Sequence, residues 1–251
     1  MRKAAKSDYK GYISWAERNT ANRVYPLSIA EGFQAGDIYT NDGDTVESVF
    51  FWHYCGFGYI SGKPSAAFLS DIYRQMISEQ RPRRLVLITD DGPALRFFRD
   101  KEVRMIPRVE YKYSGRKTPA VIDTERFRIE PVTAENIGRI EGRIVPAFSW
   151  ESGERFLKNG FGYAAVEGET VCAVAFSSAV SSGEIDIGVE TREEYRRNGL
   201  ARALAEKMCG HITRLGKKPV WAHAASNLGS GKTALSCGFA EDRRITIIKY
   251  E

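Results

Sequence analysis

The most regular pattern of apolar positions lies in the second half of the chain, between residues 198 and 215. Apolar residues recur there at spacings of four, four, four and three, which is the period of a helix with one buried face. These residues are Leu200, Leu204, Met208, Ile212 and Leu215. The pattern predicts a long amphipathic helix that begins near Asn198.

Short strand-like segments surround this helix. Residues 184–189 alternate polar and apolar side chains, as a half-buried strand does. Residues 161–166 and 171–176 are apolar on either side of a Glu-Gly-Glu turn, which predicts a hairpin. Thr133 is a candidate N-cap for a helix over 134–137, and a short helix is expected to end at Gly238. Further strands are expected at 127–132, 220–224 and 244–250.

The first half of the chain repeats part of this order. Strands are expected within 49–60, at 85–89 and at 105–113, and helices at 65–79 and 93–101. This β-α-β-α-β succession is the same as that of residues 184–250. Either the first half is a degenerate copy of the second, or the likeness reflects only the common alternation of α/β proteins. A polar Gly- and Pro-containing stretch, 114–119, predicts two α/β domains, 1–120 and 121–251.

Composition narrows the classes of partner. The 251 residues are 43% hydrophobic, which suffices for two cores. The net charge of +5 fits a solvated basic surface. The sequence has no basic stripe with interleaved aromatic residues, so no nucleic-acid partner is expected. The charge is also compatible with an anionic ligand or partner. No apolar run approaches a membrane span, so no membrane partner is expected. Four cysteines without metal-ligand spacing predict buried thiols, no metal site and a cytoplasmic protein.

The start of the long helix has the composition of an anion site. A helix N-terminus offers N–H donors and a favourable dipole to a pyrophosphate. Gly199 permits close approach, and Arg196 and Arg197 add positive charge. By itself the hexapeptide fits a basic helix start equally well. The candidate ligand residues are Arg196, Arg197, Asn198, Gly199, Leu200 and Ala201.

Three segments together resemble the GNAT N-acetyltransferases: 184–191, 194–201, and 227–230 followed by Gly238-Phe239. The resemblance covers roughly residues 125–251. It implies an α/β (α+β) GNAT fold, with a mixed twisted central sheet flanked by helices, preceded here by a smaller α/β domain. Segments 148–150, 156–162 and 219–221 further resemble the subgroup of zwittermicin A resistance acetyltransferases, in which an N-terminal α/β domain precedes the catalytic one.

The resemblance also implies roles for individual residues. Acetyl-CoA is the expected co-substrate, with its pyrophosphate on residues 196–201 and main-chain groups of Val189 and Thr191 on the pantetheine arm. Asn227 and Ser230 would approach the far side of that arm, although Asn227 also suits a helix N-cap. A main-chain N–H near Val189 is the expected oxyanion donor.

An amine acceptor must lose a proton before it attacks, so a base is required. Glu184 and Asp186 are the candidates, with Glu190 third, and each equally fits a solvated strand edge. Many GNAT enzymes use a Tyr seven residues after the Asn, but Ala234 stands there, so the acid remains unassigned. The three histidines are expected to be structural, although His223 is placed to touch a substrate.

The expected function is acetyl transfer from acetyl-CoA to a primary amine of a small molecule, by direct attack in a ternary complex. Homodimerisation is left open. A non-catalytic acyl-CoA-binding or regulatory module is the alternative. More remotely, residues 226–233 resemble a P-loop with Ser226 in place of its first glycine, but too little chain follows for a Mg²⁺-binding Asp.

Overall fold

The structure is a computed structural model that describes residues 1–19, 21–115 and 122–250. It divides into two compact units, Met1–Arg108 with Arg244–Glu251, and Val109–Arg243. The expected domain boundary near residue 120 falls outside the described residues. The compact units instead divide within strand β6 (Arg104–Tyr113), and the first unit includes the last segment of the chain.

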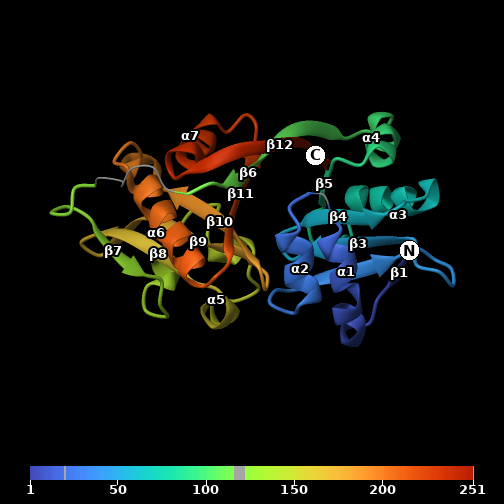
Figure 1. Cartoon of the computed structure of the whole chain (residues 1–251), viewed down its shortest axis with the longest axis horizontal. Helices are drawn as coiled ribbons and strands as arrows, with labels where there is room; N and C mark the ends of the chain where they lie inside the picture. Colours follow the sequence, from blue (N-terminus) through green and yellow to red (C-terminus); the bar gives the residue numbers. More distant parts are fainter. Residues whose placement is uncertain (20, 116–121, 251) are drawn as a thin grey trace. The chain divides into compact units, whose positions relative to one another are not determined.

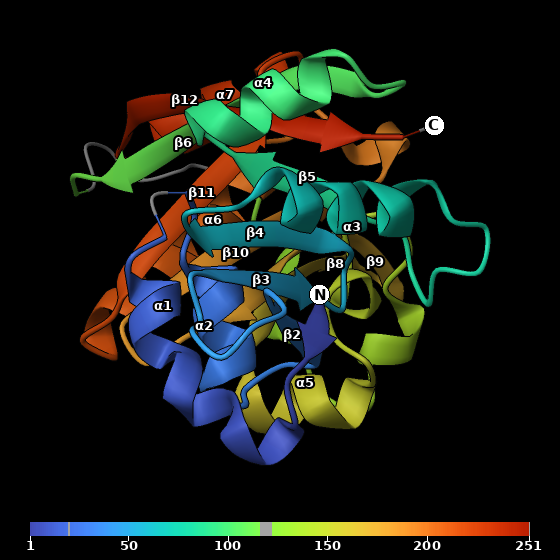
Figure 2. The same cartoon turned by 90° about the vertical axis from the view of Figure 1, so that its right-hand side faces the viewer.

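The first unit is a mixed sheet with helices on its faces. Its strand order is β1-β2-β3-β4-β5, followed by residues 244–249 of β12. Strands β4 and β5 run parallel, while β1–β2, β2–β3, β3–β4 and β5–β12 are antiparallel. Strands β2 to β4 lie side by side, with α1 and α2 next to them (Figures 1 and 2). The elements are β1 (Arg2–Lys3), a 3-10 helix (Lys6–Tyr12), α1 (Ile13–Glu17), α2 (Val24–Ala30), β2 (Gly36–Thr40), β3 (Ser48–His53), β4 (Phe57–Gly62), α3 (Ala66–Ile77), β5 (Val86–Thr89) and α4 (Gly92–Arg99).

Alternation along β3 explains how both faces of this sheet are covered. Successive side chains of a strand point to opposite faces. Phe50 and Trp52 therefore join one apolar core with residues of α3, α4 and Ile248 of β12. His53, on the other face, has its ring 5.1 Å from that of Tyr25 in α2. The continuous apolar run of β3 thus reflects burial on two sides.

The second unit is also a mixed sheet, with strand order β6-β11-β10-β9-β8-β7. Strands β10 and β11 are parallel, whereas β10–β9, β9–β8 and β8–β7 are antiparallel. Helix α6 packs on β8, β9, β10 and β11 (Figure 1). The elements are β7 (Arg128–Pro131), two 3-10 helices (Ile137–Arg139 and Pro146–Phe148), α5 (Gly153–Asn159), β8 (Gly162–Glu167), β9 (Thr170–Val180), β10 (Glu184–Thr191), a 3-10 helix (Glu193–Tyr195), α6 (Leu200–Arg214), β11 (Lys218–Ala224), α7 (Leu228–Ser236) and β12 (Phe239–Lys249).

An aromatic cluster supports the strands of this unit. The rings of Trp150 and Phe156 are 5.7 Å apart, and that of Phe176 follows at 6.2 Å from Phe156. The Trp150 indole Nε1 donates to the carbonyl of Ser177 at 2.8 Å. Gly188 of β10 leaves space for the Phe176 ring, because a Cβ there would lie 2.6 Å from it. Close packing against Phe176 therefore fixes the middle of β10.

Most of the predicted elements are confirmed. The long helix is α6, with Leu200, Leu204, Met208 and Ile212 buried, and the predicted hairpin is β8–β9. Three details were wrong. Leu215 follows the helix and is 51% exposed. Residues 134–137 do not form the expected α-helix, because the chain there makes only a 3-10 turn, Ile137–Arg139. The last strand starts at Phe239 rather than at residue 244.

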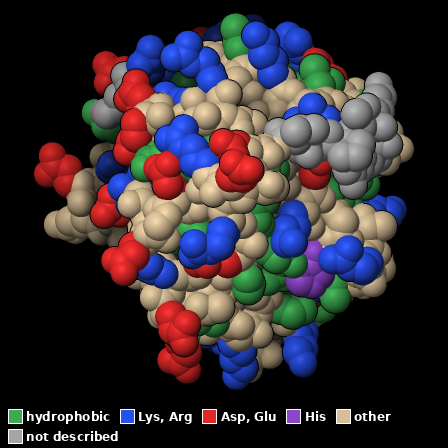
Figure 3. All heavy atoms as spheres, turned by 90° about the vertical axis from the view of Figure 1, so that its left-hand side faces the viewer, with side chains coloured by type: hydrophobic (Ala, Val, Ile, Leu, Met, Phe, Trp, Pro, Cys, Tyr) green, Lys and Arg blue, Asp and Glu red, His purple; other side chains and the backbone are tan. Residues whose placement is uncertain are grey.

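The four cysteines are free and buried, as expected. Burial raises the pKa of the Cys237 thiol to about 11. None of the helices in the described ranges has the length and apolar character to cross a lipid bilayer. On the face drawn in Figure 3, basic side chains occur across the whole face, whereas most acidic side chains lie on its left-hand part.

Candidate functional site

The parallel strands β10 and β11 diverge in the middle of β10. Their register covers only Glu184–Asp186, opposite Lys218–Val220. Against β9, in contrast, β10 continues to Thr191, with a bulge between Asp186 and Ile187. The register passes from Ala179 to Ser177, so the extra residue lies on β9, and such a bulge increases the local twist of the strand pair. In the described part of the chain, the second half of β10 does not pair with β11, which leaves the end of the sheet open where the resemblance places the thioester.

Two residues of the loop that leads into α6 have a left-handed backbone conformation. Arg196 is extended (φ −66°, ψ 157°), whereas Arg197 has φ +68° and Gly199 has φ +75°. Among the described residues, Arg197 is the only non-glycine with positive φ. A left-handed residue with a Cβ costs about 1–2 kcal/mol, and such strain concentrates at binding loops. The loop is thus held in a conformation that its sequence does not favour locally.

Helix α6 starts without a side-chain cap. In the described ranges, the other helices of eight or more residues are capped: Ser65, Asp91 and Asn227 accept from the first turns of α3, α4 and α7. Gly199 at the N-cap of α6 has no side chain to do so. The partial positive charge of this helix end is therefore available to an anion.

Side chains of the loop reinforce this arrangement. Arg196 and Arg197 are exposed beside the helix start. The Asn198 Nδ2 donates to the carbonyls of Tyr195 and Arg196, at 3.1 and 3.4 Å. These two hydrogen bonds fix the turn that precedes the helix. Six consecutive residues, 196–201, thus combine a helix start without a side-chain cap, two guanidinium groups and a preformed turn.

The end of β10 carries a polar atom that lacks a protein partner. Val189 and Thr191 pair with Ala175 and Ala173 of β9. The Thr191 hydroxyl is buried and, within the described part of the chain, has no hydrogen-bond partner. Buried hydroxyls normally have a partner, so an unpaired one indicates a missing water or ligand. The role expected for Thr191 concerns its main-chain groups and stays a prediction.

Asn227 and Ser230 hold the start of α7. The Asn227 Oδ1 accepts from the Ser230 N–H at 3.1 Å, so the predicted N-cap role is confirmed. The Ser230 hydroxyl accepts from the Trp221 indole at 3.1 Å, which ties α7 to β11. The contact of both residues with a pantetheine arm stays a prediction.

The three candidate carboxylates differ in environment. Glu184 is half-buried at the start of β10, and Asp186 is 6% exposed at the bulge. Glu190 accepts from the Ile144 N–H at 2.9 Å through Oε2, so it anchors the neighbouring loop. This hydrogen bond gives Glu190 a structural task.

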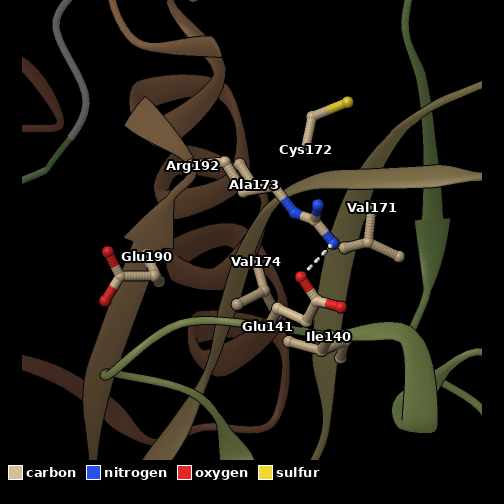
Figure 4. A pocket seen from close by; sticks show the side chains of 8 residues that line it. All are labelled: Ile140, Glu141, Val171, Cys172, Ala173, Val174, Glu190 and Arg192. Atoms are coloured by element: carbon tan, nitrogen blue, oxygen red, sulfur yellow. Dashed lines mark ion pairs between the residues drawn. The ribbon is translucent and has the colours of Figure 1, made fainter. Parts of the chain in front are cut away.

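Glu190 also lines a small hollow with Glu141 and Arg192 (Figure 4). Glu141 and Arg192 form an ion pair of 3.0 Å across it. The hollow leaves no room for a water-sized molecule. It is therefore not a ligand pocket.

His223 belongs to a buried pair that the sequence did not reveal. Its Nε2 lies 3.0 Å from the hydroxyl of Tyr111, and its Nδ1 lies 2.8 Å from the Ala224 carbonyl. If Nδ1 donates to the Ala224 carbonyl, Nε2 can accept a hydrogen bond from the Tyr111 O–H. Both groups lie under Gly231, where a Cβ would approach the imidazole to 3.0 Å. No local motif could indicate Tyr111, because it comes from β6, far away in the chain.

The P-loop alternative is wrong. Residues 228–236 form helix α7, so the stretch 226–233 provides no loop around a phosphate. His53 is fully buried in the first unit, and His211 bonds the Tyr163 hydroxyl at 2.9 Å. These two histidines and His223 thus lie in separate structural environments. Within the described ranges no cluster of three metal-ligating side chains occurs.

Comparison with known proteins agrees with the resemblance and extends it. A model of the GNAT acetyltransferase family matches residues 18–248, so the expected limit of roughly 125–251 was too narrow. An uncharacterized N-acetyltransferase of Bacillus subtilis (strain 168), YdfB, is 22% identical over 232 residues, 89% of each chain.

Solved structures are similar over nearly the whole chain. A GCN5-related N-acetyltransferase-like protein from Streptococcus suis 89/1591 has a TM-score of 0.76 at 21% identity, covering 98% of this chain and 100% of that one. A tandem GNAT protein from the clavulanic acid biosynthesis pathway has a TM-score of 0.66 at 12% identity, covering 98% and 96%. At these identities the likeness shows the fold alone, and it confirms the expected mixed sheet flanked by helices.

Proposed function

Because the chain belongs to the GNAT acetyltransferase family, we propose that it transfers an acetyl group from acetyl-CoA to a primary amine of a small molecule, by direct attack in a ternary complex. Members of this family are acyltransferases that use acetyl-CoA. The observation that carries the proposal is the uncapped start of α6 behind two left-handed residues, Arg197 and Gly199.

In this proposal, residues 196–201 bind the pyrophosphate. Main-chain groups of Val189 and Thr191 hold the pantetheine arm, and Asn227 and Ser230 approach its far side. The divergence of β10 from β11 supports this arrangement, because strand ends that separate leave main-chain groups for a ligand.

The proposed base is Glu184 or Asp186, acting directly or through water on the ammonium of the acceptor. Both lie on the half of β10 that precedes the register shift, and this supports a base on one side of the proposed thioester. A positioned base typically contributes a factor of about 100 to 10,000 in rate. Ala234 is fully buried and offers no proton, so the departing thiolate would leave unprotonated or take its proton from another group.

The pyrophosphate site can be tested with a matched pair of glycines on one helix. Gly199 at the start of α6 and Gly216 just after it have φ values of +75° and +72°. Gly199→Ala and Gly216→Ala should therefore cost similar stability, about 1 kcal/mol each. Only Gly199→Ala should weaken acetyl-CoA binding, by tenfold or more in calorimetry. Equal affinities of the two variants for acetyl-CoA would show that the loop is wrongly assigned.

Transfer itself is tested by release of free thiol from acetyl-CoA across a panel of primary amines. Glu184→Gln and Asp186→Asn should lower kcat, with Glu169→Gln, in an exposed hairpin turn, as the control. If acetyl-CoA binds tightly and no amine supports thiol release, the non-catalytic acyl-CoA-binding or regulatory module is the correct function.

Three further features belong to this proposal. The first unit is a degenerate GNAT copy, because both units follow the order of strand, helices, three strands, helix, strand, helix, strand. The chain falls in the zwittermicin A resistance-type subgroup, with domains near 1–120 and 121–251. It acts in the cytoplasm, where four free thiols stay reduced, as a monomer or homodimer.

A further inference from the structure

The first unit has its own pair of parallel strands that diverge. Strands β4 and β5 pair at Phe57–Val86 and Gly58–Leu87. Beyond these pairs, the ends of both strands line a cavity of about 360 Å³, together with residues between α1 and α2 and the start of α4. This volume is at the lower end of the range for small-molecule sites, roughly 300–1,000 Å³. The cavity is large enough for a compact ligand.

The inner wall of the cavity is polar and fixed by hydrogen bonds. The Asn19 Nδ2 donates to the Ile60 carbonyl at 3.1 Å and to the Ser61 hydroxyl at 3.2 Å. The Thr89 hydroxyl accepts from the Asp91 N–H at 3.0 Å. Ser61 and Thr89 are 4% and 3% exposed. Each hydroxyl accepts one bond here and still has a proton to donate, so the wall offers donors in set positions.

Groups of both charges stand around this wall. The Arg18 guanidinium lies 4.4 Å from the centre of the Trp15 ring, and its Nε donates to the Ser14 carbonyl at 3.1 Å. These contacts orient the guanidinium and use one of its five N–H donors. Opposite charges come from Asp90 and Asp91, which line the same cavity. One cation and two carboxylates suit a ligand that itself carries both signs.

The connection after β4 argues against a nucleotide in this cavity. Between Gly62 and Ala66 only residues 63–65 intervene, whereas eight residues, 192–199, join β10 to α6. The Ser65 hydroxyl accepts from the Phe68 N–H at 3.2 Å and so occupies the start of α3. The first unit therefore lacks the open helix end that the second unit offers to a pyrophosphate.

We propose that this cavity binds a free amino acid, with the α-carboxylate at Arg18, the ammonium at Asp90 and Asp91, and the side chain against Ser61 and Thr89. The two units would then have diverged in ligand, one holding an acyl donor and the other a small zwitterion.

The test uses the full chain and the twenty common L-amino acids as probes, first by saturation-transfer NMR and then by calorimetry on those that bind. Arg18→Gln and Asp90→Asn should each raise the Kd of the amino acid that binds by about tenfold or more. Glu17→Gln, at the exposed last residue of α1 next to Arg18, and Arg99→Gln, at the exposed far end of α4, are the controls and should change the Kd by less than about twofold. Melting curves check that all four variants are folded.

Acetyl-CoA and single-charge probes distinguish the outcomes. Acetate and methylamine should bind far more weakly than the amino acid, and Arg18→Gln should leave acetyl-CoA affinity unchanged. The proposal is overturned if no amino acid binds at millimolar concentration, or if Gly199→Ala abolishes amino-acid binding while Arg18→Gln does not. Loss of acetyl-CoA affinity in Asp90→Asn would likewise overturn it, because the cavity would then belong to the acyl donor.

Discussion

Replacing Arg197 by glycine should make the protein more stable and its acetyl-CoA site weaker. Arg197 has φ +68°, which a Cβ disfavours by about 1–2 kcal/mol. Glycine relieves that strain but gains about 0.5–1 kcal/mol of unfolded-state entropy. The difference predicts a net stabilisation of about 0–1.5 kcal/mol for Arg197→Gly.

The same substitution removes a guanidinium beside the uncapped start of α6. A hydrogen bond to a charged group contributes about 1.5–3 kcal/mol, which is a factor of about 10 to 150 in Kd. Arg197 is exposed, so solvent screening places the expected effect at the lower end, near tenfold. Stability and affinity should therefore move in opposite directions.

Two control variants separate strain from charge. Arg197→Lys keeps both the Cβ and the positive charge. Its stability should therefore not change, and its affinity for acetyl-CoA should fall less than that of Arg197→Gly. Arg197→Asn removes the charge while keeping a side chain that tolerates the left-handed region. Urea unfolding gives the free energy of unfolding, and calorimetry gives the Kd of acetyl-CoA.

Two results would refute this reasoning. Destabilisation by Arg197→Gly of more than about 1 kcal/mol would mean that the arginine makes stabilising contacts rather than bearing strain. Unchanged affinity in both Arg197→Gly and Arg197→Asn would mean that its charge does not reach the phosphates.

Three further predictions concern stability and reactivity. Burial, and then Arg83, lowers the pKa of His53 to about 3. Since the pKa in the unfolded chain is near 6.5, this contribution to stability should be complete above about pH 6.5 and fall by about 1.4 kcal/mol per pH unit below it. The free energy of unfolding of His53→Gln should fall less steeply. Unfolding curves between pH 4 and 8 measure both slopes, and equal slopes would contradict the prediction. The four buried thiols should react with an aromatic disulfide reagent at pH 8 only after denaturant is added, and fast labelling of native protein would show otherwise. Asn227→Ala removes the cap of α7 and should cost about 1 kcal/mol in urea unfolding, whereas Ser226→Ala, one residue earlier, should cost little.

The periodic parts of the chain were predictable because burial on one face leaves a direct trace in the sequence. Leu200, Leu204, Met208 and Ile212 identified α6, and the apolar segments around Gly168 identified the β8–β9 hairpin. The N-cap role of Asn227 is also local, since it depends on a residue three positions away. Such features need no knowledge of distant segments.

Features that depend on distant segments were not predictable. Tyr111 and His223 meet only because β6 lies beside β11. The anchoring of Glu190 by Ile144 requires the loop at 140–145 to return to the end of β10. The positive φ of Arg197 was also missed, because glycine or asparagine is the usual residue in that conformation, and Asn198 and Gly199 follow it directly.

Residues 244–249 belong to the first unit, so that unit cannot complete its sheet until the end of the chain has been synthesised. Strand β5 gains an antiparallel neighbour only when Thr246–Lys249 pairs with it, and Ile248 fills a position in the core with Phe50 and Trp52. These residues leave the ribosome after the whole of the second unit, so one edge of β5 stays unpaired until then. Open edges invite pairing with other chains. A fragment that ends near residue 120 would keep that edge permanently, and we expect it to aggregate where the full chain does not.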